Sequence, residues 1–215
     1  AVLFQIFLLA SGLETRREAL VIFGFHCVAT VMELYKTSSM IGSWHYPEEA
    51  YFAFLGVPLF AGFMYSAVGS YIARAWTVLK LRFSDYPKLV HTYVLAALVY
   101  VNFFTHHFII DLRYILVGYA FLIFWRTRVF FTVSREHSMP LLAGFVLVSA
   151  FVWVAENMAT FANVWIYPHQ RAGWTLVSPD KLVAWFLLMI VSFVLVSLLH
   201  RRVLRKCQNG RVTPC

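Results

Sequence analysis

Two glutamates, Glu33 and Glu156, lie inside long apolar stretches, each on a polar stripe with helical spacing. The residues of these stripes are His26, Thr30, Glu33 and Thr37 in the first, and Ser149, Glu156, Thr160 and Asn163 in the second, with Asn157 beside Glu156. Such spacing places each stripe on one helix face, which then points to other helices rather than to lipid. A glutamate at this depth is a functional candidate, and we expect Glu33 and Glu156 to act as general acids or bases. The alternative is an interhelical hydrogen bond made by a neutral glutamate.

A second group of chemical side chains follows the apolar stretch that ends near residue 105. Its members are His106, His107, Asp111 and Arg113. His107 and Asp111 are four residues apart and can meet on a helical segment, so we expect both to be catalytic. Arg113 is expected to bind substrate and to neutralise Asp111 or a buried glutamate. The alternative is an interfacial loop whose histidines lie among lipid headgroups.

Histidine and carboxylate are also the ligands that zinc and similar divalent metals prefer. If such a cofactor is bound, we expect His45, His106 and His107 as its ligands, although no His-x-x-His or His-Glu-x-x-His pattern is present. Three more polar residues are expected to bind substrate beside Arg113, namely Glu48, Tyr65 and Asn157.

The elements that position these residues are strongly apolar. Hydrophobic residues make up 61% of the chain and its mean hydropathy is +0.71, above the usual range of a soluble domain. We expect an all-α, polytopic transmembrane bundle of about seven helices, forming one domain over residues 1–215. The expected helices are 2–13, 19–36, 51–74, 89–105, 112–133, 140–163 and 181–200. We expect Pro58 to bend the third helix, and Arg126 and Arg128 to snorkel from the end of the fifth.

The basic residues alternate along the chain. Segments that follow the odd-numbered helices carry 14 Lys and Arg residues, and the other segments carry 4. Because cytoplasmic loops retain Lys and Arg, we expect the amino terminus outside and the basic tail, residues 201–215, in the cytoplasm. The net charge of +8 is assigned to this bias, so the expected partner is the lipid bilayer and not nucleic acid. Both groups of candidate residues then lie toward the outer side, where we expect one pocket.

A short pattern occurs twice, as Trp-His-Tyr-Pro at residues 44–47 and as Trp-Ile-Tyr-Pro at residues 165–168. Each copy follows one of the two glutamates by about ten residues. Repeated halves of this kind occur in transporters, where Glu33 and Glu156 would be corresponding protonation sites. The alternative is that Trp, Tyr and Pro are ordinary interfacial residues.

The chain resembles the YoaT-like family of bacterial integral membrane proteins, a family of unknown function. The matching segments are residues 44–48, 56–60, 62–65, 102–107, 155–157 and 165–168. The resemblance implies a bacterial inner-membrane protein and implies no activity. Residues 47–52 are also similar to the Pro-x-Glu-Glu pattern of membrane lycopene cyclases, which implies protonation of a polyene by the acids.

Three functions follow from these patterns. The one we expect is an enzyme that acts on a lipid or isoprenoid-like substrate by Glu/His acid–base or metal-assisted chemistry, in a pocket open to the outer side. The second is an ion-coupled transporter that uses Glu33 and Glu156 as protonation sites. The third is a non-catalytic subunit of a membrane complex, which requires polar stripes that satisfy one another's hydrogen bonds.

Overall fold

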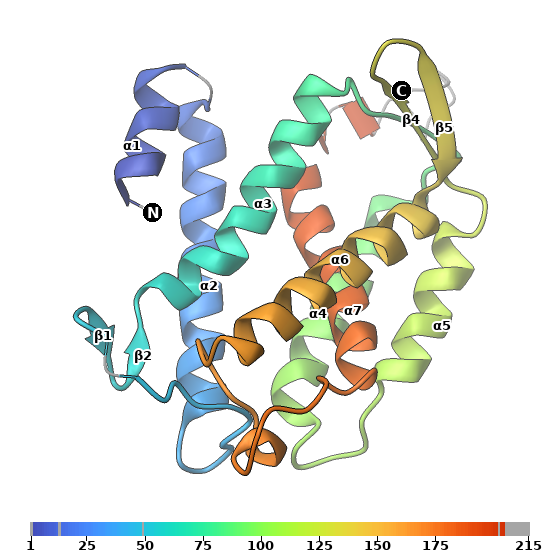
Figure 1. Cartoon of the computed structure of the whole chain (residues 1–215). Helices are drawn as coiled ribbons and strands as arrows, with labels where there is room; N and C mark the ends of the chain where they lie inside the picture. Colours follow the sequence, from blue (N-terminus) through green and yellow to red (C-terminus); the bar gives the residue numbers. More distant parts are fainter. Residues whose placement is uncertain (1, 13, 49, 202, 205–215) are drawn as a thin grey trace. The chain divides into compact units, whose positions relative to one another are not determined.

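The computed structural model describes residues 2–12, 14–48, 50–201 and 203–204. Most of these residues are helical, and Figure 1 labels all the elements except β3 and η1. The helices are α1 (Val2–Ala10), α2 (Arg16–Thr37), α3 (Phe60–Val78), α4 (Leu89–Thr105), α5 (Arg113–Phe124), α6 (Leu141–Phe161), the 3-10 helix η1 (Pro168–Gln170) and α7 (Asp180–Ser197). The strands are β1 (Ala53–Phe54), β2 (Val57–Pro58), β3 (Arg82–Ser84), β4 (Arg128–Thr132) and β5 (Glu136–Pro140). The helical architecture predicted from the sequence is confirmed, and the strands were not expected.

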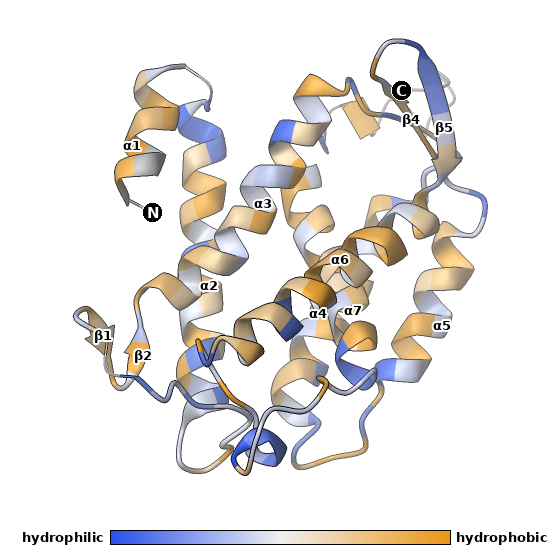
Figure 2. Ribbon diagram, viewed as in Figure 1, coloured by the Kyte–Doolittle hydropathy of each residue, from blue (hydrophilic) through white to orange (hydrophobic). Residues whose placement is uncertain are grey.

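Within the described residues, three helices, α2, α6 and α7, are long and apolar enough to cross a membrane. The helices α4 and α5 are apolar but shorter. Figure 2 shows the apolar character of most helical ribbons, with hydrophilic residues gathered in the connections and in β5. These features are those of a membrane protein. Of the predicted basic tail, residues 202 and 205–215 lie outside the described residues.

The predicted third helix starts later than expected, because residues 53–58 form a small antiparallel hairpin. Leu55 and Gly56 make its turn with φ angles of 50° and 79°. A two-residue hairpin turn favours positive φ at both central positions, and glycine adopts this conformation readily. Pro58 therefore lies in β2 and does not bend a helix, and α3 begins only at Phe60.

The predicted fifth helix ends earlier than expected, at Phe124. Residues 128–132 form β4, the central strand of an antiparallel sheet with the order β3-β4-β5. This strand has the sequence Arg-Val-Phe-Phe-Thr, and branched and aromatic side chains favour a pleated, half-buried surface. Arg126 therefore follows the helix and Arg128 belongs to a strand, so neither snorkels from a last helical turn.

The chain divides into two compact units, one formed by residues 1–70 and 154–178 and the other by residues 71–153 and 179–215. They are called unit 1 and unit 2.

In unit 1, α2 begins with a capping box, in which the backbone N–H of Glu18 donates to Thr15 Oγ1 at 3.3 Å and Glu18 Oε2 accepts from the Thr15 N–H at 2.7 Å. Close packing of α3 on α2 depends on Gly62, where a Cβ atom would lie 2.5 Å from both His26 Nδ1 and Thr30 Oγ1.

An aromatic core holds unit 2 together. Phe193 of α7 lies 5.5 Å from Trp76, 5.7 Å from Phe83 and 5.2 Å from Phe145, measured between ring centroids. Phe145 in turn contacts Phe124 at 5.7 Å, and all five side chains are buried. Because Phe83 belongs to β3, this core anchors the three-stranded sheet to the helices of the same unit.

Candidate functional site

Glu33, on α2 in unit 1, is almost fully buried, with 1% of its surface exposed. Its Oε2 atom accepts two hydrogen bonds from the loop that follows the helix, one from Trp44 Nε1 at 3.0 Å and one from the Tyr46 hydroxyl at 2.8 Å. The Tyr65 hydroxyl, from α3, is a further hydrogen-bonding neighbour of Glu33. The carboxylate is thus enclosed by aromatic donors from two parts of the unit.

Glu156, on α6 in unit 1, is also buried, with 4% of its surface exposed. Its Oε1 atom accepts a hydrogen bond of 2.5 Å from the Tyr167 hydroxyl. The backbone N–H of Tyr167 donates to Gln170 Oε1 at 3.1 Å, which fixes the start of η1. Asn157, beside Glu156, accepts a hydrogen bond of 2.9 Å from the backbone N–H of Val177, so this predicted substrate-binding residue holds the following loop.

The two Trp-x-Tyr-Pro loops pair with each other. His45 N donates to Ile166 O at 3.1 Å and Ile166 N donates to His45 O at 3.0 Å, which makes an antiparallel bridge between the middle residues of the two patterns. Across this bridge the rings of Trp44 and Tyr167 meet edge to face, with centroids 6.2 Å apart. The structure therefore brings both glutamates into one group, here called the glutamate cluster, made of Glu33, Trp44, Tyr46, Glu156 and Tyr167.

The tyrosines of the glutamate cluster remain hydrogen-bond donors. Burial raises the pKa of the Tyr46 hydroxyl far above its ordinary value, and the neighbouring charge of Glu33 raises it further. Burial and the charge of Glu156 likewise raise the pKa of Tyr167. Deprotonation of either phenol beside a carboxylate is therefore strongly disfavoured, so these groups can hold the acids but cannot serve as bases near neutral pH.

Two other predicted residues of unit 1, His45 and Glu48, belong to the first loop or follow it directly. His45 is half-buried and takes part in the bridge through its backbone, while Glu48 is exposed. His169 is exposed as well, and its ring is parallel to that of Tyr167 at a centroid distance of 5.8 Å. Sequence reasoning found the two acids but did not assign Trp44, Tyr46 and Tyr167 as their donors; the repeated pattern was the available signal.

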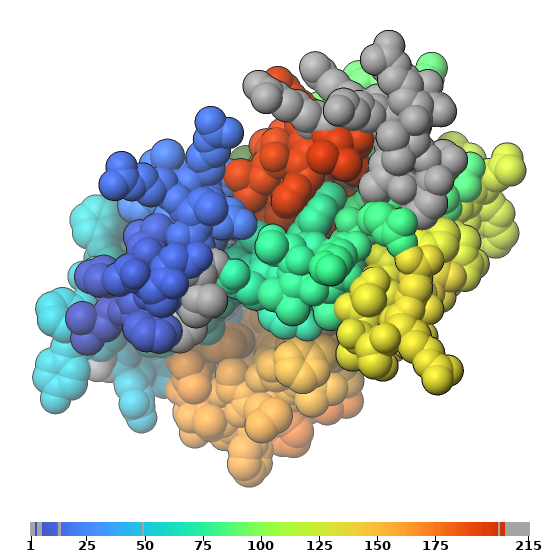
Figure 3. Space-filling view, turned by 90° about the horizontal axis from the view of Figure 1, so that it is seen from above, coloured from blue at the N-terminus to red at the C-terminus, as the bar shows by residue number. Residues whose placement is uncertain are grey.

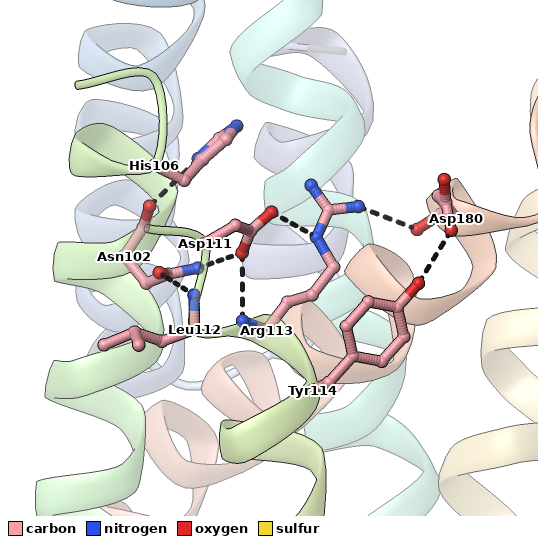
Figure 4. A network of polar contacts seen from close by, with 7 residues as sticks. All are labelled: Asn102, His106, Asp111, Leu112, Arg113, Tyr114 and Asp180. Carbon is pink, nitrogen blue, oxygen red and sulfur yellow. Dashed lines mark hydrogen bonds and ion pairs between the residues drawn. The ribbon is translucent and has the colours of Figure 1, made fainter. Parts of the chain in front are cut away.

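The second predicted group, at the connection from α4 to α5, forms a network within unit 2 (Figure 4). Asp111 Oδ1 accepts from Asn102 Nδ2 at 3.1 Å and from the Arg113 N–H at 2.9 Å, and its Oδ2 pairs with Arg113 Nε at 2.5 Å. Asn102 Oδ1 accepts from the Leu112 N–H at 2.9 Å. Partial burial raises the pKa of Asp111, but the hydrogen bonds from Asn102 and Arg113 outweigh it and hold this pKa below its ordinary value.

The network continues from Arg113 to the start of α7. Arg113 Nη1 donates to the backbone oxygen of Asp180 at 3.4 Å, and the Tyr114 hydroxyl donates to the Asp180 carboxylate at 2.9 Å. His106 Nδ1 lies 2.9 Å from the backbone oxygen of Asn102. The centroid of the His106 ring lies 4.1 Å from that of the exposed His107 ring. Asp111 and Arg113 thus form an ion pair that joins the ends of three helices in this unit.

Metal binding is not supported in the part of the chain that the structure describes. There, no group of three or more His, Cys, Asp or Glu side chains is arranged to hold a metal ion. His106 and His107 belong to unit 2 and His45 to unit 1.

These features define a class, an integral membrane protein with a helical fold like that of the Insig homologues. A mycobacterial Insig homolog, MvINS from Mycobacterium vanbaalenii, has a solved structure that matches 85% of this chain and 93% of its own, with a TM-score of 0.60 and 13% identity. A cross-linked MvINS trimer matches 88% of this chain and 96% of its own, with a TM-score of 0.62 and 14% identity. At this level of identity the likeness concerns the fold alone.

The chain belongs to the family described as "Protein of unknown function (DUF817)", which matches residues 1–193. The Bacillus subtilis (strain 168) protein described as "Uncharacterized protein YoaT" is 46% identical over 201 residues, which cover 93% of this chain and 75% of that protein. The membership predicted from the sequence is therefore confirmed.

Proposed function

We propose that this chain is a non-catalytic subunit of a membrane assembly, in which the glutamate cluster holds the outer loops closed over the helices. The observation that carries this proposal is the enclosure of both buried glutamates by hydrogen-bond donors from two loops that also pair with each other. A general acid or base must direct its proton or lone pair at a substrate. Here Glu33 Oε2 and Glu156 Oε1 accept hydrogen bonds from the protein's own aromatic side chains.

The hydroxyl groups of the two polar stripes support the same function. Each donates to a backbone oxygen of its own helix, as seen for Thr30 to His26, Thr37 to Glu33, Ser149 to Phe145 and Thr160 to Asn157. A buried carboxylate is destabilising unless donors surround it, so a satisfied cluster fixes the position of the loops that supply them. Among the described residues His26 Nδ1, on the first stripe, is buried without a hydrogen-bond partner, so the support comes from the hydroxyl groups and the glutamate cluster.

The charge bias extends the proposal to location. The protein lies in the bacterial inner membrane as a multi-pass protein, with its amino terminus and the glutamate cluster on the outer side and its carboxyl terminus in the cytoplasm. Its immediate partner is the lipid bilayer. Cysteine accessibility to a membrane-impermeant reagent tests this orientation, with exposed Ser134→Cys expected to react only after the membrane is opened and exposed Glu48→Cys expected to react in intact cells.

The partner subunits that we propose are further copies of this chain. The solved MvINS structure that shares this fold was cross-linked as a trimer. A homotrimer of this 24.8 kDa chain gives a particle of about three times that mass once bound detergent is subtracted. Light scattering coupled to size exclusion measures this mass, and a monomer at all concentrations would remove the self-assembly part of the proposal.

The role of the glutamate cluster is tested with Glu156→Gln, and Glu48→Gln is the matched control because it changes an exposed acid in the same unit. Loss of the charge-assisted hydrogen bond from Tyr167 is expected to lower the free energy of unfolding by about 1.5–3 kcal/mol. The control is expected to stay within about 0.5 kcal/mol of the parent protein. Equal effects of the two substitutions would contradict a structural role for Glu156.

An enzyme that acts on a lipid or isoprenoid-like substrate is the second candidate, and one observation favours it. The Tyr167 hydroxyl donates a hydrogen bond to Glu156, and the Tyr167 ring is parallel to the ring of His169. Tyr167 therefore connects a buried acid to a histidine, two groups that can exchange protons with a substrate. Mass spectrometry of a membrane lipid extract incubated with the purified protein separates the candidates. A product formed by the parent protein and lost in Glu156→Gln would replace the subunit proposal, and an unchanged lipid profile supports it.

A further inference from the structure

The three-stranded sheet of unit 2 has an exposed edge. In the order β3-β4-β5, the strand β5 is an edge strand, and among the described residues it pairs with β4 alone. Four of its five residues are exposed, and Figure 2 shows this strand as hydrophilic. Unpaired backbone groups are not tolerated against lipid hydrocarbon, so the sheet lies in the headgroup region or in water.

The register of the sheet gives it two different faces. Phe83 and Val129 are opposite each other and buried, which places their face against the aromatic core of unit 2. Successive side chains of a strand point to opposite faces of the sheet, so Arg128 points to the face opposite Val129. On that face Arg128 Nη2 donates to Ser138 Oγ at 3.0 Å. The face that points away from the core therefore carries Arg128 and Ser138, together with the half-buried Phe130.

The helix that leads into this sheet is short. The 12 residues of α5 span about 18 Å at 1.5 Å per residue, while the hydrocarbon core of a bilayer is about 30 Å thick. A helix shorter than the hydrocarbon core draws its flanking residues toward the membrane. Trp125, which follows α5, is 73% exposed, and tryptophan is enriched at membrane–water interfaces. The start of β4 is thereby held at the level of the headgroups.

The cations around the hairpin exceed the acids. Arg82 and Glu136 form an ion pair and neutralise each other. Among the described residues, the remaining exposed Lys and Arg side chains on this side of unit 2 are Lys80, Lys88, Arg126, Arg128, Arg135 and Arg201, against the exposed acid Asp85. The hairpin, yellow in the space-filling view of Figure 3, lies beside the end of α3, where the Thr132 N–H donates to Leu79 O at 2.9 Å. Most of these cations thus lie in the hairpin or in the segments that flank it and pair with it.

We propose that the β4–β5 hairpin and its flanking residues are a docking surface for the headgroups of anionic phospholipids such as phosphatidylglycerol. Arg126, Arg128 and Arg135 supply planar guanidinium groups, which bind a phosphate diester through two parallel hydrogen bonds. Trp125 places its ring among the upper acyl chains of the same lipid. The charge bias assigns this surface to the cytoplasmic leaflet, where a juxtamembrane basic segment is attracted to anionic lipid.

The test is a native mass spectrometry titration of the detergent-purified full chain with phosphatidylglycerol and, separately, with phosphatidylcholine. The parent chain is expected to bind phosphatidylglycerol more tightly. Arg126→Gln combined with Arg128→Gln is expected to lower that affinity about 25-fold, about fivefold for each arginine, and to leave phosphatidylcholine binding unchanged. The combination of Arg16→Gln and Arg17→Gln removes two exposed cations from unit 1 and is expected to change the affinity less than about twofold.

Equal binding of the two lipids by the parent chain, or equal losses in the two double variants, would overturn the proposal. Competition by inorganic phosphate at about 10 mM would also overturn it, because the surface would then be a free-anion site. If the Arg128 substitution unfolds the sheet, Arg126→Gln with Arg135→Gln replaces it, since both of these positions lie outside the strands. In that variant, an unchanged affinity for phosphatidylglycerol would contradict the proposed surface.

Discussion

Trp44 and Tyr167 contact each other across the antiparallel bridge between their loops, and each donates a hydrogen bond to a different buried glutamate. The two loops and the two acids are thus mutually dependent, since moving one loop removes a donor from an acid and also changes the ring contact. Networks of this kind in a low-dielectric interior are strengthened cooperatively when complete and are costly when one member is missing.

Tyr46→Phe is expected to destabilise unit 1. The substitution removes one donor from Glu33 Oε2 and keeps the edge-to-face contact of the ring with Phe60. The loss of a hydrogen bond to a charged group corresponds to about 1.5–3 kcal/mol of unfolding free energy, measured by denaturant titration in detergent. Tyr51→Phe is the matched control, because Tyr51 is fully exposed. Similar losses in the two variants would contradict the role assigned to Tyr46.

Gly62→Ala is expected to disrupt the packing of α3 on α2. The added methyl group would lie 2.5 Å from His26 Nδ1 and Thr30 Oγ1, so the helices must separate, at a cost of about 1–3 kcal/mol. Gly118→Ala in α5 is the control, because a Cβ there meets no atom within 4 Å and improves helix propensity. We expect the thermal unfolding midpoint to fall for Gly62→Ala and to stay equal or rise for Gly118→Ala. The opposite order would show that α2 and α3 do not approach closely at Gly62.

The ion pair of Asp111 and Arg113 is expected to make unit 2 sensitive to acid. The pKa of Asp111 is lowered in the folded protein, so its stabilisation is fully present above the ordinary pKa of about 3.9 and is lost as the pH falls through the lowered value. The unfolding midpoint of the parent protein should therefore fall more between about pH 6 and pH 3 than that of Asp111→Asn. Asp85→Asn, at an exposed position, should keep the parental slope. Equal slopes for all three proteins would rule out this ion pair as a source of acid sensitivity.

Local sequence patterns predicted the helices well where length and hydropathy agree. The bounds of α2, α4, α6 and α7 lie within three residues of those expected. The errors occur where backbone conformation or distant pairing decides the structure. The hairpin before α3 depends on the positive φ angles of Leu55 and Gly56, and β4 depends on pairing with Arg82–Ser84, more than 40 residues away along the chain. An apolar run such as residues 121–133 favours a helix until such a partner is known.

The acids of the candidate site could be predicted from helical spacing, and their partners could not. Glu33 and Glu156 stand out because ionisable groups are rare in apolar helices. Their donors lie on loops, and the path of a loop is set by contacts that periodicity does not encode, such as the bridge of His45 with Ile166. The repeated Trp-x-Tyr-Pro pattern was visible, but its antiparallel pairing is a three-dimensional property. Asp111 and Arg113 were predicted together, and the structure adds Asn102 and Asp180 as their partners.

The central claim is that the two loops and the two glutamates form one hydrogen-bonded cluster, and a double-mutant cycle of Trp44→Phe and Tyr167→Phe tests it most directly. Unfolding free energies of the parent protein, both single variants and the double variant are measured under identical detergent conditions. Coupled residues in one network give an interaction energy of about 0.5–3 kcal/mol, and we predict a value in this range. Losses that add to within about 0.3 kcal/mol would show that the two loops act independently and would contradict the account.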